Sequence, residues 1–327
     1  MIHNLERFSY RPQTAAYRPV GLAPPVPVLE EPRGNYTLAE AYRYCERMVQ
    51  GRDESVPVAS RFLPPEERAC MLSVYAFARA ANDITDEPYY ADRRAEALDT
   101  WEQELHRAFH GEADHPIFVA LRHTIERCDL PVTPFEELLT AYRMDLVVHR
   151  YPTFQDLRRY CALSAEPLGR LMLYIFGYRD PALLAYADEL CVGLQVANFL
   201  QDLGIDLNGH RNRLYLPLED LHHFGVKEDD LRRGCAEPAY RDLMRFQVAR
   251  ARALLERGRP LIDRVGRELS FELELIWQSG QAVLDKIEAV DYDVFRRRPV
   301  LGRADRARLL ARALARRWPR FIGRSQA

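Results

Sequence analysis

Apolar residues recur along most of this chain at steps of three and four positions, which is the spacing of one face of a helix. The pattern runs from about residue 37 to about residue 318, and strand-like alternation is scarce. Thr37 and Glu40 have the spacing of a capping box, so the first helix is predicted to begin at Thr37. Turns are predicted at five clusters of breaker residues: Pro64-Pro65, Asp129 to Pro134, Tyr151-Pro152, Tyr178 to Pro181 and Asn208 to Asn212. The sequence therefore predicts a single all-α domain.

Two acidic motifs interrupt helical runs that are otherwise apolar. In the first run the polar exceptions lie mostly three or four positions apart, and they are Tyr75, Arg79, Asn82, Asp83 and Asp86. In the second run they are Gln195, Asn198, Asp202 and Asp206. Each set forms one stripe along its helix, in which residues four apart are separated by about 6 Å along the axis. We call these sets the first and the second acidic stripe.

Carboxylates within apolar sequence are costly to bury unless a cation compensates them. If both stripes face one cavity, their oxygen ligands would hold divalent metal, and the predicted ligands are Asn82, Asp86, Asp202 and Asp206. Oxygen ligands favour Mg²⁺, with Mn²⁺ as an alternative, and metal held in this way would bind a diphosphate. Arg79 would add a bidentate phosphate contact. A single Asp pair at this spacing is usually a solvated helix face, but the repetition of the pattern favours a site.

Composition limits the class of protein. The 47% of hydrophobic residues can form a sizeable core, and the net charge of −2 gives no reason to expect nucleic acid as a partner. The six cysteines are scattered without a C-x-x-C pair, which indicates reduced thiols in a cytoplasmic protein. No uninterrupted apolar stretch approaches the roughly 18 residues of a membrane span, and no secretory signal is seen. We expect a protein that is soluble or bound to a membrane surface.

The two motifs, in this order, resemble those of the squalene/phytoene synthase family of isoprenoid synthases. Residues 58–64 resemble the first signature helix of that family, and residues 75–83 its first aspartate-rich motif. Residues 198–206, followed by 213–217, resemble the second. The resemblance covers residues 37–300 and implies a single-domain isoprenoid synthase helical bundle around a central cavity.

Within this family the chain is most similar to the branch that forms hydroxysqualene in bacterial hopanoid biosynthesis. The similarity lies in residues 55–60, 160–170 and 284–295. Gln201 favours the same branch, because phytoene and squalene synthases usually carry Arg at that position. The resemblance implies presqualene diphosphate as the substrate, Mg²⁺-assisted loss of diphosphate and capture of the cation by water. No hydride donor is needed, and the chain lacks a G-x-G-x-x-G fingerprint, so NAD(P)H is not expected.

The resemblance also assigns roles to single residues. The catalytic set that it implies is Tyr75, Asp83, Asp86, Asp202 and Asp206. The substrate contacts that it implies are Ser55, Arg79, Tyr160, Ser164, Gln195, Asn198, Arg213 and Tyr215. The resemblance places Tyr160, Ser164 and Gly169 on one helix that lines the cavity, and ordinary helix packing is the alternative. Tyr142, Arg143 and Asp145 are either supporting partners of the site or members of a partly exposed ion pair.

The chain departs from the family pattern at two places. Asn82 stands where the family normally has Asp, so metal affinity on that side is expected to be lower or shifted to Asp83. The loop after Asp206 looks longer than usual, so Arg211 competes with Arg213 for the phosphate-facing role. Arg213 is favoured because Tyr215 follows it.

The two ends of the chain differ from its core. Residues 1–36 are rich in Pro and lack periodicity, which predicts a flexible extension. Residues 301–327 form a basic amphipathic segment, in which arginines alternate with leucines. This segment either lies on an anionic bilayer or packs its leucines on the core, and the water-insoluble product favours the bilayer. The expected location is the cytoplasm, at the inner face of a bacterial membrane, where other squalene-pathway enzymes are candidate partners.

Two other functions stay open. One is a family enzyme that condenses two molecules of farnesyl diphosphate head to head, giving presqualene diphosphate or squalene. The other is a non-catalytic relative that acts as an assembly factor and would be expected to lose its metal carboxylates. Asn82 points weakly to the second, whereas the retained aspartates argue against it.

Overall fold

The protein is all-α, as the sequence predicts. The computed structural model describes residues 27–49, 62–209 and 212–322 of the chain. No strand of a sheet occurs in these ranges, and an isolated bridge joins Arg150 to Leu214. The elements in chain order are η1 Val28–Glu30, α1 Leu38–Val49, α2 Pro65–Asp86, η2 Pro88–Tyr90, α3 Arg94–Phe109, α4 Pro116–Cys128, α5 Thr133–Met144, α6 Phe154–Ser164, α7 Glu166–Ile175, α8 Pro181–Asn208, α9 Leu218–His223, α10 Glu228–Arg232, α11 Pro238–Gly258, η3 Arg259–Asp263, α12 Arg267–Ala289 and α13 Arg303–Ile322.

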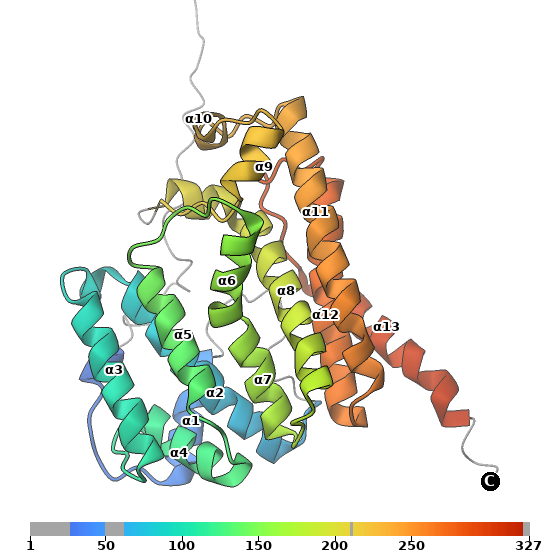
Figure 1. Ribbon diagram of the computed structural model, residues 1–327. Helices are drawn as coiled ribbons and strands as arrows, with labels where there is room; N and C mark the ends of the chain where they lie inside the picture. The colour runs from blue at the N-terminus through green and yellow to red at the C-terminus, as the bar shows by residue number, and fades with distance from the viewer. Residues whose placement is uncertain (1–26, 50–61, 210–211, 323–327) are drawn as a thin grey trace, which may run out of the picture.

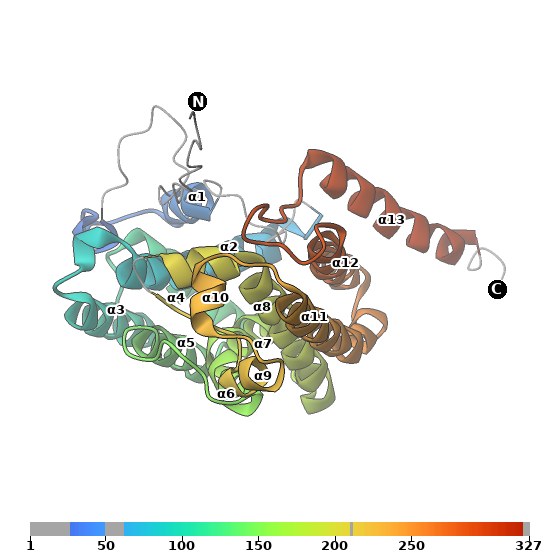
Figure 2. The same ribbon diagram turned by 90° about the horizontal axis from the view of Figure 1, so that it is seen from above.

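The helices form one bundle around a shared apolar core. In Figure 1, α6 and α7 follow one another end to end between α5 and α8, with α3 and α4 on one flank and α11 and α12 on the other. Seen from above in Figure 2, α2 runs behind α5 and α7, and it packs against α1 and α4 as well. The two helices that carry the acidic stripes, α2 and α8, both contact α7.

The apolar face of α2 is buried as its spacing predicts. Val74, Phe77, Ala81 and Ile84 have no exposed surface. The Phe77 ring meets that of Trp101 at 5.9 Å and also contacts two further phenylalanines, in α4 and α5. This packing fixes the rotation of α2 and so fixes the direction in which its acidic stripe points.

Close helix contact holds α8 against α11 and α12. A Cβ at Gly193 would lie 2.9 Å from the backbone N of Leu255, and a Cβ at Gly258 would lie 2.6 Å from the backbone N of Leu190. Gly280 of α12 approaches the Leu194 side chain in the same way. We call Gly193, Gly258 and Gly280 the glycine seam. Because two of these contacts are with backbone atoms, the seam cannot widen by side-chain rotation alone.

Gly258→Ala is expected to destabilise the fold by about 1–3 kcal/mol, since the added methyl overlaps the Leu190 backbone. Urea unfolding of the purified variant measures this change. Gly34→Ala is the matched control, because a Cβ there would have nothing within 4 Å, and its effect should stay within about 0.5 kcal/mol. Equal stabilities of the two variants would show that the seam tolerates a methyl group.

Residues 27–36, the first that the structure describes, contact the helical bundle. Residues 27–36 fall within the predicted flexible segment, yet the Val28 carbonyl lies 3.0 Å from His115 Nε2, and Val28 itself is buried. The Arg33 guanidinium pairs with Glu104 and Asp114, both at 2.9 Å. Residues 27–36 thus contact the bundle, residues 1–26 lie outside the described ranges, and the flexibility of the extension stays a prediction. The predicted capping box is present, because the Thr37 backbone N–H donates to the Glu40 carboxylate at 2.9 Å.

The basic C-terminal helix α13 packs on the bundle over part of its length. Ala313 is buried against Phe271 and Leu275 of α12, and the Arg316 guanidinium donates to the Glu274 carboxylate at 2.6 Å. Figure 2 shows the helix leaving the bundle toward its C-terminal end. The packing alternative is therefore confirmed for this stretch, and binding of the remaining basic face to a membrane surface stays a prediction.

Helix α8 is the one described helix that is long and apolar enough to cross a bilayer by length and composition. Half of its most apolar window is buried inside the protein, and it packs against α7, α11 and α12. Core helices of soluble proteins have the same properties, so we assign α8 to the core of the bundle.

Candidate functional site

The first acidic stripe is bonded along its own helix. The Arg79 Nε donates to Asp83 Oδ1 at 3.1 Å, and the Asn82 amide donates to Asp86 Oδ2 at 3.0 Å. The Thr85 hydroxyl also donates to Asp86, at 2.9 Å. Asn82 therefore orients Asp86 by a hydrogen bond, a role that an aspartate at position 82 could not take without a proton.

The Arg79 side chain has capacity left for an anion. Its Nη2 is buried and has no hydrogen-bond partner among the described residues, while its Nε is paired with Asp83. An unpaired buried guanidinium nitrogen is costly, and a phosphate oxygen would satisfy it. Tyr75, one turn before Arg79, is half-buried. The predicted contacts Ser55 and Arg211 lie outside the described residues.

The second acidic stripe lies at the C-terminal end of α8. Gln195 and Asn198 are half-buried on this helix. Asp202 Oδ1 accepts a hydrogen bond from Arg298 Nε at 2.6 Å. Burial, together with the neighbouring Asp202 carboxylate, raises the pKa of Asp206 to about 8. Asp206 therefore keeps its proton near neutral pH when no cation is bound, and a cation bound at this stripe would favour its ionised form.

A buried ion pair follows the second stripe. Asp145 and Arg213 are each about 5% exposed, and the Arg213 Nη1 lies 3.5 Å from Asp145 Oδ2. The Arg213 Nη2 donates to the Asp145 backbone carbonyl at 2.8 Å, and the Tyr215 hydroxyl donates to the Asp145 carboxylate at 3.4 Å. Burial raises the pKa of Asp145, and Arg213 opposes that rise. Both Nη groups of Arg213 thus interact with Asp145 in this structure. The contact of Arg213 with diphosphate stays a prediction.

Aromatic rings enclose the same ion pair. The Tyr215 ring stacks on Phe199 at 3.9 Å with an interplanar angle of 6°, and it also stacks on Tyr160 at 5.7 Å. Tyr151 stacks on the other side of Tyr215 at 5.9 Å. The cluster lies beside the ion pair, because the Tyr215 hydroxyl donates to Asp145.

Tyr160 and Gly169 do not share one helix, contrary to our expectation. Tyr160 and Ser164 lie on α6, which ends at Ser164, whereas Gly169 lies on α7. A Cβ at Gly169 would meet Cys191 Sγ at 2.6 Å, so the packing alternative is correct for this glycine. The Ser164 Oγ is buried and has no hydrogen-bond partner in the described part of the chain.

The end of α5 lies between the two stripes. The Tyr142 hydroxyl donates to the Ala78 carbonyl of α2 at 2.9 Å, and its pKa is raised by burial and by the charges of Asp145 and Asp83. The charge of Asp145 in turn raises the pKa of Asp206. Both stripes therefore act electrostatically on one short segment, residues 142–145. Arg143 points elsewhere and pairs with Asp99 and Glu102 of α3.

The predicted metal ligands form two pairs, one on each stripe. Within the described residues no three His, Cys, Asp or Glu side chains gather closely enough to hold one metal ion. Each stripe instead offers two oxygen-bearing side chains one turn apart: Asn82 with Asp86, and Asp202 with Asp206. Mg²⁺ is commonly bound by one or two carboxylates, with waters and substrate phosphates as its other ligands. The donor set fits such an ion at each stripe.

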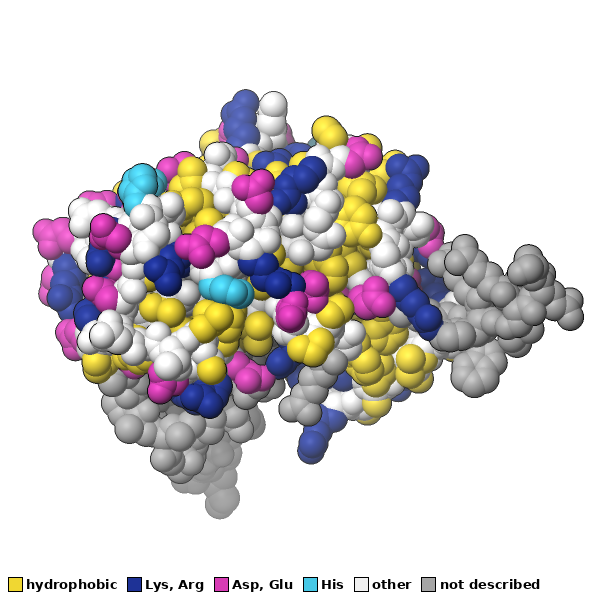
Figure 3. Space-filling view, turned by 90° about the horizontal axis from the view of Figure 1, so that it is seen from below, with side chains coloured by type: hydrophobic (Ala, Val, Ile, Leu, Met, Phe, Trp, Pro, Cys, Tyr) yellow, Lys and Arg dark blue, Asp and Glu magenta, His cyan; other side chains and the backbone are white. Residues whose placement is uncertain are grey.

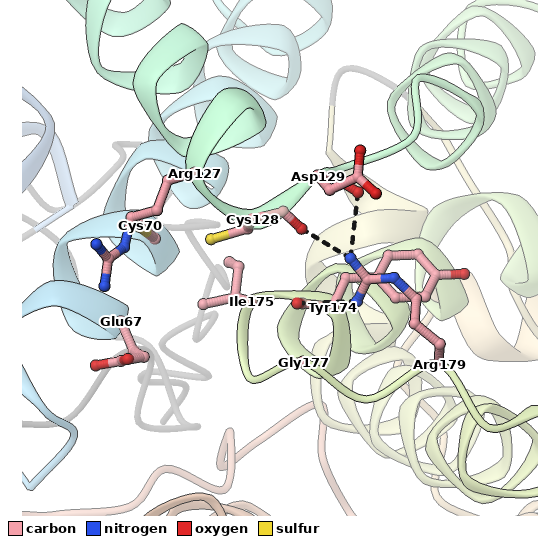
Figure 4. A pocket seen from close by; sticks show the side chains of 9 residues that line it. All are labelled: Glu67, Cys70, Arg127, Cys128, Asp129, Tyr174, Ile175, Gly177 and Arg179. Carbon is pink, nitrogen blue, oxygen red and sulfur yellow. Dashed lines mark hydrogen bonds between the residues drawn. The ribbon is translucent and has the colours of Figure 1, made fainter.

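A solvent-connected cavity of about 440 Å³ lies far from both stripes. Figure 4 shows its lining, in which Arg179 donates to the backbone carbonyls of Cys128 and Asp129 at 2.7 and 3.2 Å. Cys70 also lines it and lies about 20 Å along α2 from Asp83, from the helix rise. Figure 3 looks onto this end of the bundle, where basic, acidic and apolar side chains are interspersed. None of the predicted site residues lines this cavity.

Two residues next to the stripes escaped the sequence reasoning or were left undecided by it. Arg298 contacts Asp202 across 96 positions of sequence, and it belongs to none of the motifs discussed above. Asp145 joins Arg213 across 68 positions. A basic cluster directly after a segment that resembles the family, residues 296–298, was the one signal that pointed to Arg298.

Comparison with known proteins decides the family. The model of the squalene/phytoene synthase family matches residues 49–305. The chain belongs to the squalene/phytoene synthase family. A 15-cis-phytoene synthase of Synechococcus elongatus is 32% identical over 280 residues, which cover 80% of this chain and 88% of the relative. The phytoene synthase of Arthrospira platensis is 30% identical over 275 residues, with the same two coverages.

Solved structures of the family confirm the fold. The crystal structure of squalene synthase HpnC from Alicyclobacillus acidocaldarius has a TM-score of 0.73 and 42% sequence identity, and the match covers 78% of this chain and 95% of HpnC. A dehydrosqualene synthase structure reaches a TM-score of 0.78 at 22% identity and supports the fold alone. The predicted isoprenoid synthase bundle is thus confirmed.

Proposed function

We propose that this protein is a hydroxysqualene synthase, which ionises presqualene diphosphate with the help of divalent metal and lets water capture the cation. The observation that carries the proposal is the similarity to squalene synthase HpnC, at 42% identity over 78% of the chain. The phytoene synthases are more distant, at 30–32% identity. Gln201, in the position where phytoene and squalene synthases usually carry Arg, supports the same choice.

In this proposal the two stripes bind the diphosphate through metal. Asn82 and Asp86 would hold one divalent ion, and Asp202 and Asp206 would hold another. Mg²⁺, or Mn²⁺ in its place, neutralises the charge that develops on departing diphosphate. The buried Arg79 Nη2 would bind a phosphate oxygen directly, because it is the nitrogen left unpaired beside Asp83.

In this proposal aromatic residues of α6 and α8, together with Tyr215, would stabilise the carbocation. The stacked rings of Tyr160, Phe199 and Tyr215 offer π faces that stabilise positive charge without reacting as a nucleophile. The Ser164 hydroxyl, which is buried without a partner in the described residues, is available to hold the water that attacks the cation. The reaction needs no reductant, in accord with the sequence, which carries no nicotinamide-binding fingerprint.

Incubation of purified protein and Mg²⁺ with presqualene diphosphate, and separately with farnesyl diphosphate, tests the assignment. We expect hydroxysqualene and diphosphate from presqualene diphosphate, and no product from farnesyl diphosphate. Gas chromatography with mass spectrometry measures the alcohol. Formation of presqualene diphosphate from farnesyl diphosphate would refute the assignment.

A head-to-head condensing enzyme is the second candidate, and the identity to phytoene synthases favours it. Such an enzyme joins two prenyl diphosphates, so it would turn over farnesyl or a longer allylic diphosphate in the same assay. A non-catalytic relative would give no product from any of these substrates.

A further inference from the structure

The segment that joins α12 to α13 lies against the second acidic stripe (Figure 2). Its Arg298 donates to Asp202 through Nε at 2.6 Å. The two side chains are 40% and 30% exposed, so the pair is open to solvent on one side. Asp202 is one of the predicted metal ligands, and a protein cation therefore already occupies one of its oxygens.

The segment is fastened to α8 at the residue next to Arg298. Gln201, which is 2% exposed, donates through Nε2 to the carbonyl oxygen of Pro299. Phe295 of the same segment rests on Gly204, where a Cβ would lie 3.2 Å from its ring. The Tyr240 ring packs on the other side of Phe295 at 5.1 Å. These contacts leave Arg298 little freedom to sit elsewhere.

Gln201 helps to place the Arg298 guanidinium beside Asp202, because it holds the backbone of the next residue, Pro299. Gln201 precedes Asp202 on α8, but neighbouring positions of a helix point in different directions, so the position 201 side chain faces the segment that joins α12 to α13. The uncharged Gln201 is turned away from solvent and holds the Pro299 carbonyl. The charge beside Asp202 is then contributed by Arg298, 96 positions away.

We propose that Arg298 is a resident counter-ion of the second stripe, which competes with divalent metal for Asp202 and is placed there by Gln201. The proposal rests on the proposed function, because it takes the second stripe as a metal site. Half-exposed ion pairs contribute about 0.2–1 kcal/mol. Arg298 therefore lowers the affinity for metal alone by at most about 5-fold. Diphosphate, which brings its own ligands to the metal, overcomes this competition, so metal and substrate are expected to load together.

Binding of Mn²⁺ alone, measured by electron paramagnetic resonance of the free ion without any substrate, tests the proposal. Arg298→Gln should bind Mn²⁺ about 2- to 5-fold more tightly than the wild type. Arg297→Gln is the matched control, since it removes the same charge from the neighbouring position, where the side chain is exposed. It should change Mn²⁺ affinity by less than half as much. Equal effects of the two variants, an unchanged affinity or a weaker one in Arg298→Gln would overturn the proposal.

Two further variants test separately the placing role of Gln201 and the assignment of Asp202 as a metal ligand. Gln201→Met keeps a side chain of similar length but cannot hold the Pro299 carbonyl, so it should also bind Mn²⁺ more tightly. If Gln201→Met proves unstable, the comparison of Arg298→Gln with Arg297→Gln still decides. Asp202→Asn reports on the metal site itself. If that variant binds Mn²⁺ as well as the wild type, the metal assignment fails; if it binds weakly while Arg298→Gln gains nothing, only the counter-ion role fails.

Discussion

Asp202→Asn and Asp206→Asn should each lower turnover of presqualene diphosphate by on the order of 10³-fold, with little change in helical content. Each substitution keeps the shape of the side chain but removes the charge that the second stripe would offer to metal. Product formation under saturating Mg²⁺, with circular dichroism of the same samples, measures both quantities. Glu189→Gln, on the same helix but paired with Arg158 and Arg257, is the control and should stay within about 3-fold of wild-type activity. Undiminished turnover in both aspartate variants would remove the metal site from the proposed function.

The same Asp206→Asn variant should be more stable than the wild type when metal is absent. The pKa of Asp206 is raised to about 8, whereas an aspartate in the unfolded chain titrates near about 3.9. Folding therefore loses stability as pH rises from about 4 to about 8, because the unfolded chain gives up the proton more readily. Asparagine removes this loss, so the difference in Tm should grow across that range and be largest at its upper end. A residue that serves the fold alone would behave in the opposite way, since its replacement would lower the Tm.

Asp145→Asn should destabilise the protein by about 3–5 kcal/mol, which lowers the Tm by on the order of 10 °C. The substitution keeps an acceptor for Tyr215 but leaves Arg213, which is 5% exposed, as a buried cation without its counter-ion. Differential scanning calorimetry measures the change. The double variant Asp145→Leu with Arg213→Met should recover much of the stability, because it removes both charges together.

An exposed ion pair is the comparison for this effect. Asp285 is 62% exposed and pairs with Arg252 at 3.1 Å, so Asp285→Asn should cost at most about 1 kcal/mol. A similar loss in Asp145→Asn and Asp285→Asn would mean that the Arg213 guanidinium reaches solvent after the substitution.

The features that the sequence predicted well are local. The Thr37–Glu40 capping box and the buried face of α2 depend on residues within one or two turns of each other, and both are confirmed. The all-α fold follows from the same short-range periodicity. That the two stripes face one cavity stays a prediction, because it depends on how two distant helices are placed and not on the spacing within either one.

The features that the sequence missed depend on distant partners. The position of Arg298 is decided by the Gln201 contact with Pro299, and no spacing rule connects these residues. The contact of Val28 with His115, 87 positions later, could not be predicted from a Pro-rich segment without periodicity. Asp145 remained undecided since a charge next to a helix end has the same sequence pattern whether it is buried or exposed.

If the proposed function is correct, the glycine seam limits how the size of the accepted hydrocarbon can be engineered. Gly193 and Gly258 bring α8 and α11 to backbone contact, so this side of the bundle cannot move to admit a longer chain. Helices α2, α5 and α7 contact one another, and none of the seam glycines lies on them. Libraries meant to change prenyl chain length should therefore be placed on those three helices.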